Sequence, residues 1–249
     1  MSINSHQYKV INNNFKSKSS AIIEDLDTKE LYFQKEIKYQ KLTEEKIKEI
    51  IPIIKDNPTV LPVVDFQSSA VQNNHLILVT KYLKNGSLKE FLEKNKNCLT
   101  EDKKQIIIYG IAFAMMHFHI HDIYSGNLSI DHIYIDDNCY PYVDFSTFSS
   151  LKEQNIDDKE KYFLKSEDIL SFLIIYYEVM TGVEIFINDQ NKHIIPDLSL
   201  IQDDAHKLFL QKNWSNGIRQ IISFREIFNE INILYSVEFL RYNLIVDDY

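Results

Sequence analysis

Residues 78–92 are Leu-Val-Thr-Lys-Tyr-Leu-Lys-Asn-Gly-Ser-Leu-Lys-Glu-Phe-Leu, and this stretch decides how the chain is organised. Its beginning belongs to a run of β-branched and apolar residues, 76–80, that predicts a strand. After Gly86, Ser87 and Glu90 stand three residues apart, which is the spacing of a capping box at a helix start. Strand-like runs precede this stretch and helix-like runs follow it. It therefore predicts the junction between a β-rich part and a helical part.

The part before the junction predicts strands around one helix. Thr43 followed by Glu44 and Glu45 indicates a helix start, because a hydroxyl caps the first turn and acids favour the positive end of the helix dipole. Pro52 lacks an amide hydrogen, so we expect this helix to kink or end there. Polar residues 25–29 predict a hairpin turn. The strand-like runs are residues 8–11, 21–23, 31–37, 60–66 and 76–80.

The part after the junction predicts long buried helices. Residues 105–119, opened by Thr100, and residues 169–180 are apolar on nearly every face, which places these helices inside a domain. Between them, 133–135 and 140–145 flank a polar turn and predict a second hairpin. The order of elements predicts an α+β fold with a small antiparallel β lobe that carries one helix and a larger, mainly helical lobe.

Composition narrows the function. The 249 residues carry a formal net charge of −9, which argues against a nucleic-acid partner. The longest apolar stretch, 106–116, is too short to cross a bilayer, so we expect no membrane association. Residues 1–10 are polar and lack the apolar core of a signal peptide, and two cysteines, Cys98 and Cys139, cannot form a disulfide framework. We therefore expect a cytoplasmic protein.

Glycine is scarce. The chain has five glycines and none before Gly86. Glycine lets a backbone approach a phosphate closely, so its absence excludes a glycine-rich phosphate loop in the N-terminal third.

Several strings, in this order, resemble a eukaryotic protein kinase domain of the tyrosine-kinase-like group. They are residues 78–92, 115–136, 165–178 and 214–227. The resemblance covers Tyr8 to about Ile233 and implies one kinase-like domain. Its parts would be an N-lobe over about 8–80, a hinge over 81–84 that faces adenine, and a C-lobe over 85–240.

The loop that carries catalysis in this family is altered. Ser125, Gly126 and Asn127 stand where the family has His-Arg-Asp, and a neutral amide cannot accept the substrate proton as the aspartate does. Ser129 replaces a lysine. His132 replaces the asparagine that binds magnesium, and neutral imidazole is a poor ligand for that hard cation. The resemblance therefore implies an inactive loop, whose backbone Asp168 would hold.

Asp144-Phe-Ser146 resembles the Asp-Phe-Gly motif, but two alignments are open. The spacing from Asn127 is one residue short of the family's usual spacing. A deletion in the preceding turn makes Asp144 the magnesium aspartate, which we favour. A gapless alignment puts Phe145 there instead. Asp144 is also placed to cap a turn.

The nucleotide pocket is altered as well. Lys35 stands where the family has its phosphate lysine, with Glu49 as its ion-pair partner and Thr80 as gatekeeper, although a plain surface pair of Lys35 and Glu49 is also open. Phe33 replaces an alanine that lies over the adenine ring, so it would block the pocket. The positions of the loop glycines hold Phe15, Ser17 and Ser20.

The segment from Asp144 to Asp168 is shorter than a usual activation segment and lacks Ala-Pro-Glu. Ile221 stands where the family has the buried arginine that pairs with that glutamate. Removing one member of a buried ion pair costs about 3–5 kcal/mol, so joint loss is what a stable fold requires. His117, His119 and His121 are close in sequence, but we expect no metal site, because His119 matches a structural histidine of the family.

Together these features predict a pseudokinase, a kinase-like domain that acts as a protein-binding scaffold or allosteric regulator and needs no cofactor. An active kinase or its substrate is the kind of partner that the resemblance implies. The alternative is an active or weakly active protein kinase that binds ATP and magnesium through Lys35 and Asp144.

Overall fold

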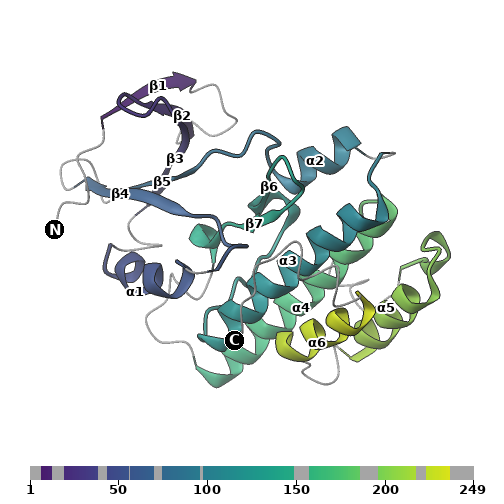
Figure 1. The fold of residues 1–249 in the computed structure, drawn as a ribbon. Helices are drawn as coiled ribbons and strands as arrows, with labels where there is room; N and C mark the ends of the chain where they lie inside the picture. Colours follow the sequence, from purple (N-terminus) through teal and green to yellow (C-terminus); the bar gives the residue numbers. More distant parts are fainter. Residues whose placement is uncertain are drawn as a thin grey trace.

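A computed structural model of the chain describes residues 7–12, 20–38, 44–55, 57–69, 75–95, 98–148, 157–185, 196–216 and 223–235. The predicted α+β architecture is confirmed: a five-stranded antiparallel sheet precedes a group of helices in the chain and lies beside it in space (Figure 1). The sheet has the order β1-β2-β3-β5-β4. Its strands are β1 (Tyr8–Asn12), β2 (Ser20–Asp25), β3 (Leu31–Lys38), β4 (Val63–Ser69) and β5 (His75–Lys81).

The sheet register places the candidate pocket residues on β3 opposite β5, the strand that leads into the predicted hinge. Phe33 on β3 pairs with Thr80 on β5, and Lys35 pairs with Leu78. The predicted turn between β2 and β3 is present, because one Asp25 carboxylate oxygen accepts the amide hydrogens of Asp27 and Thr28. The turn and the strand register together fix the positions of Phe33 and Lys35 on β3.

Helix α1 (Glu44–Ile54) packs beside the sheet and continues past the expected end at Pro52. Proline lacks the hydrogen that would bond four residues back, but only two residues follow it in this helix, so the loss falls in the last turn. A ring nitrogen of His117 lies 2.7 Å from the carbonyl oxygen of Ile53 and ties this end to the helical part. The expected capping residue Thr43 lies outside the described residues.

The helical part is built around two helices that are buried along most of their length. Both are longer than the sequence predicted: α3 spans Glu101–Ile120, and α4 spans Asp158–Thr181. Ser87 and Glu90 make the predicted reciprocal hydrogen bonds at the start of α2, the helix that precedes α3 in the chain. Around α3 and α4 lie α2 (Leu88–Asn95), α5 (Asp204–Asn216) and α6 (Phe224–Leu234).

A two-stranded hairpin, β6 (Ile133–Ile135) and β7 (Pro141–Val143), lies between the sheet and the helices (Figure 1). Val143 donates its amide hydrogen to Thr59 and accepts that of Leu61, both in the connection from α1 to β4. On its other side, Pro141 packs so closely on α3 that a Cβ at Gly110 would lie 2.5 Å from the proline ring. The hairpin therefore joins the two lobes.

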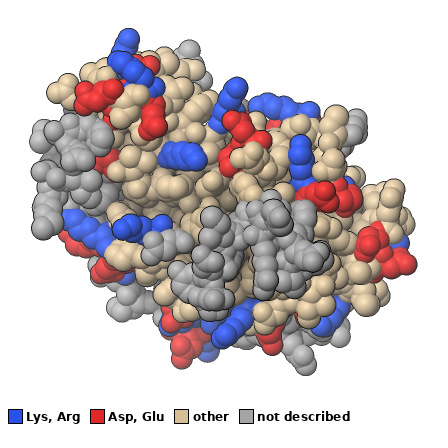
Figure 2. Space-filling model, viewed as in Figure 1, with Lys and Arg blue, Asp and Glu red and all other residues tan. Residues whose placement is uncertain are grey.

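Lysine and arginine are interspersed with aspartate and glutamate on the face shown in Figure 2. A partner that approaches this face meets both signs of charge. Among the described helices, none is long and apolar enough to cross a membrane.

Candidate functional site

An ion pair joins the two lobes at the centre of the site. Lys35 on β3 donates from Nζ to Oδ2 of Asp144, at 3.1 Å, and to Oγ of Ser146, at 3.0 Å. Asp144 follows β7, and its other carboxylate oxygen accepts the amide hydrogen of Ser146, which caps the short helical turn η2 (Phe145–Thr147). The same carboxylate therefore caps a turn and binds the lysine.

Asp144 is far more buried than its partner. The Asp144 side chain is 4% exposed and that of Lys35 is 25% exposed. Burial alone would raise the pKa of Asp144, but the Lys35 ammonium and hydrogen bonds from Ser146 and Lys35 outweigh it and hold that pKa below its ordinary value. The carboxylate is therefore ionised at neutral pH.

The geometry bears on the two open alignments. Asp144 is the residue whose side chain faces Lys35, whereas Phe145 is buried in the hydrophobic core. The contact with Lys35 therefore favours Asp144 as the residue at the first position of the Asp-Phe-Gly motif.

Glu49 does not pair with Lys35 in this structure, which corrects the expected ion pair. Glu49 lies 3.0 Å from Lys46, one turn earlier on α1, and its side chain is 64% exposed. In the resemblance to the kinase family, Glu49 is one residue out of register with the position of the ion-pair glutamate. On a helix, one residue is a rotation of about 100°, enough to carry a side chain from an inner face to solvent.

Asp168 on α4 holds the loop that the resemblance identifies as catalytic. Its carboxylate is fully buried and accepts the amide hydrogens of Ser125, at 2.9 Å, and Gly126, at 2.7 Å. The imidazole of His119 lies 2.9 Å from the same carboxylate. Gly126 has a φ of +62°, a conformation that other residues adopt only at a cost. Glycine adopts this conformation without that cost.

Asn127, Ser129 and His132, which replace charged or metal-binding residues of the family, have neutral side chains. The Asn127 side chain is exposed, and the backbone amide of Asn127 donates its hydrogen to Oγ of Ser125. Ser129 caps the turn η1 (Ile130–His132), because its hydroxyl accepts the amide hydrogen of Asp131. Burial lowers the pKa of His132 and outweighs the nearby Asp144, which raises it, while Lys35 lowers it further; the imidazole is therefore neutral beside the ion pair. Its buried Nδ1 has no hydrogen-bond partner among the described residues.

Two aromatic rings lie close together where the resemblance places adenine. Phe33 is half-buried, so it fills less of the lobe interior than the sequence suggested, and its ring centroid lies 6.4 Å from that of Tyr134 on β6. Thr80 is buried and donates its hydroxyl hydrogen to the Phe33 carbonyl at 3.4 Å. The sequence analysis missed Tyr134, although its place in the hairpin two residues after His132 was a usable signal. It also missed Ser146 as a partner of Lys35.

These residues do not fit a bound adenine as they stand. Each aromatic contact face needs a separation of about 3.5 Å, so a base between two rings needs about 7 Å. The Phe33 and Tyr134 rings are 6.4 Å apart and inclined at 46°.

Some expected features cannot be placed. Ser20 begins β2, but the other two glycine positions of the loop, Phe15 and Ser17, lie outside the described residues, as does Ile221. Within the described residues, no group of three or more His, Cys, Asp or Glu side chains could hold a metal ion.

The chain matches the model of a known protein family. A family model described as protein tyrosine and serine/threonine kinase matches residues 33–223. The match covers most of the chain, which therefore belongs to this family and has its two-lobed α+β fold. The matched range includes every site residue placed above apart from Ser20.

Individual relatives share about a quarter of their residues with this chain over the matched regions. A probable serine/threonine-protein kinase gdt8 of Dictyostelium discoideum is 26% identical over 222 residues, covering 77% of this chain and 16% of the relative. The serine/threonine-protein kinase VIK of Arabidopsis thaliana is 24% identical over 232 residues, covering 74% of this chain and 50% of the relative. A putative serine/threonine-protein kinase/receptor, R831 of Acanthamoeba polyphaga mimivirus, is 24% identical over half of this chain. The chain thus spans half or less of the length of these relatives.

Proposed function

We propose that this chain is a pseudokinase of the tyrosine-kinase-like group, a kinase-like domain that transfers no phosphate and acts by binding another protein. The observation that carries the proposal is the register of the loop 125–132. Because Asp168 binds the amides of Ser125 and Gly126, Asn127 is the next residue and faces solvent at the catalytic position. Its amide cannot act as the base that orients and deprotonates a substrate hydroxyl.

The surroundings of the loop support the same function. Phe33 and Tyr134 narrow the position where the resemblance places adenine. His132 is a neutral imidazole where the family has the asparagine that binds magnesium. Each replacement weakens nucleotide or metal binding, so the domain retains the kinase shape while its chemistry is removed. We further propose that it acts in the cytosol as a scaffold or regulator of an active kinase or of that kinase's substrate.

Phosphate transfer tests this proposal. We expect the purified chain, incubated with labelled ATP and magnesium, to label neither itself nor myelin basic protein or casein above the level of an Asp144→Asn variant. Transfer by the wild-type chain that is lost in Asp144→Asn would overturn the proposal. That outcome would mean that the site works despite Asn127.

One observation favours the alternative, an active or weakly active kinase. Lys35 and Asp144, the two groups that would serve phosphate and magnesium, remain in contact at 3.1 Å. Nucleotide binding separates the two proposals, because a ligand that binds only the folded state raises its heat stability. The pseudokinase proposal predicts no shift in the melting temperature with Mg-ATP. A shift that disappears in Lys35→Ala would support the alternative.

A further inference from the structure

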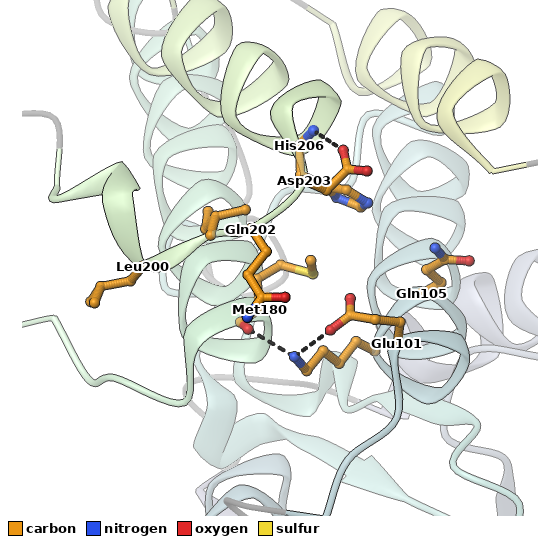
Figure 3. A pocket seen from close by; sticks show the side chains of 9 residues that line it. Glu101, Gln105, Met180, Leu200, Gln202, Asp203 and His206 are labelled. Carbon is orange, nitrogen blue, oxygen red and sulfur yellow. Dashed lines mark hydrogen bonds and ion pairs between the residues drawn. The ribbon is translucent and has the colours of Figure 1, made fainter.

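A cavity of about 450 Å³ lies at the side of the helical part, away from the site described above. Its walls are the first turns of α3, the last turn of α4, the short helix η4 (Leu198–Leu200) with the residues after it, and the first turn of α5. In Figure 3, the carboxylates of Glu101 and Asp203 project from α3 and from the start of α5 toward a common space. This volume is within the range of small-molecule sites in proteins, about 300–1,000 Å³.

The wall of the cavity has one negative charge in excess. Two carboxylates, Glu101 and Asp203, face one ammonium, Lys104. Lys104 is already engaged, because its Nζ lies 2.7 Å from Glu101 Oε1 and donates to the Met180 carbonyl at 2.9 Å. Asp203 makes no ion pair with another described residue, and one of its oxygens accepts the amide hydrogens of Ala205 and His206. Its second carboxylate oxygen is left for a cation.

The cavity also presents a hydrogen-bond donor from a nearly buried side chain. His206 is 6% exposed and lines the cavity. Its Nδ1 lies 2.5 Å from the Tyr176 hydroxyl, and that hydroxyl oxygen accepts the hydrogen of Tyr235 at 3.5 Å. Tyr176 therefore directs its own hydrogen at Nδ1, which leaves the imidazole hydrogen on Nε2. Among the described residues Nε2 has no partner.

Burial lowers the pKa of His206, in keeping with a neutral ring at pH 7. A neutral ring with its hydrogen on Nε2 can donate it to an acceptor in the cavity. A ligand for this cavity would therefore combine a cation for Asp203 with an oxygen acceptor for His206. Met180 and Ile201 supply apolar parts of the cavity wall, which suits an aliphatic stem.

We propose that the cavity binds an arginine residue of a partner protein, with its guanidinium at Asp203 and its backbone carbonyl oxygen at Nε2 of His206. An arginine residue carries the cation, the aliphatic stem and the acceptor in one unit, and one N–H of its guanidinium can donate to the Asp203 oxygen that the α5 amides do not use. This proposal stands independently of the proposed loss of phosphate transfer.

Calorimetric titration of the full chain tests it. The probe is N-acetyl-L-arginine N-methylamide, which mimics an arginine within a peptide. We expect binding with a dissociation constant on the order of 1 mM, and none by the leucine analogue at the same concentration. Butylguanidine keeps the guanidinium and the aliphatic stem and lacks the carbonyl, so it should bind more weakly. Asp203→Asn should weaken binding at least about tenfold, because an asparagine still caps α5 but carries no charge.

Asp197→Asn is the matched control. Asp197 caps η4 through the amide of Ser199, in the same way that Asp203 caps α5, and it does not line the cavity. This variant should bind as the wild type does. Failure of the wild-type chain to bind the arginine probe at about 10 mM, or equal weakening by the two variants, would overturn the proposal. Butylguanidine bound as tightly as the probe would overturn the carbonyl contact to His206.

Discussion

The ion pair between Lys35 and Asp144 supports a prediction whose size follows from burial. Lys35→Met leaves the Asp144 carboxylate, 4% exposed, without its cation. Removing one member of a buried pair costs about 3–5 kcal/mol. Because Lys35 is 25% exposed and the Ser146 amide still bonds the carboxylate, we expect the lower end, a loss of about 3 kcal/mol. Lys35→Met/Asp144→Asn removes both charges and should recover about half of that loss or more.

The loss should depend on pH in one direction. In the wild type, the pKa of Asp144 lies below its ordinary value, so the pair stabilises the fold above pH 4, roughly, and this contribution is lost as the pH falls through the lowered pKa. In Lys35→Met, burial acts without the ammonium and raises the pKa of the carboxyl group. The variant then takes up a proton more readily than the wild type. Its stability deficit should therefore shrink as the pH is lowered.

Urea unfolding provides the assay, with the fluorescence of Trp214 as the signal, since it is the single tryptophan and is fully buried. Lys46→Met is the matched control, because it removes an equal charge from the exposed pair with Glu49 and should cost less than about 0.5 kcal/mol. The reasoning fails if Lys35→Met is no more destabilising than Lys46→Met at pH 7. It also fails if the double variant is as unstable as Lys35→Met alone.

Three further substitutions test other contacts by the same unfolding assay. Phe33→Ala should cost roughly 1–2 kcal/mol, because the ring is half-buried, and a loss above about 3 kcal/mol would show a filled interior position. Asp168→Ala leaves two buried amides without their acceptor and should cost about 3–5 kcal/mol; a loss under 1 kcal/mol, roughly, would mean that another group holds the loop. Gly126→Ala places a side chain at a φ of +62° and should cost about 1–2 kcal/mol, whereas no loss would contradict the loop conformation.

Local features of this fold were predictable from the sequence. The capping box of Ser87 and Glu90 is a contact between residues three apart, so its residue types are enough to locate a helix start. The burial of α3 and α4 followed from the absence of a polar face. Helix ends were less predictable. Helix α1 tolerates Pro52 because the helix ends soon after it, and tertiary packing sets where that end falls.

The candidate site was predictable only where the resemblance gave a residue both a position and a partner. The direction of the Glu49 side chain depends on how α1 is rotated about its axis. The neighbouring residues in the sequence do not determine that rotation. The contact of Phe33 with Tyr134 joins residues about a hundred positions apart, and the cavity at Asp203 and His206 needs three helices placed together. Such contacts depend on how the elements pack, so composition and spacing do not reveal them.

ATP consumption tests the central claim most directly, because it requires no knowledge of a protein substrate. The chain is incubated in excess over ATP with magnesium, and loss of the γ-phosphate is followed beside Asp144→Asn and buffer alone. Because Asn127 cannot act as a base and the nucleotide position is narrowed by Phe33 and Tyr134, ATP should disappear at the same rate in all three samples. Faster loss in the wild type, abolished in Asp144→Asn, would contradict the claim that this kinase-like domain performs no phosphate chemistry.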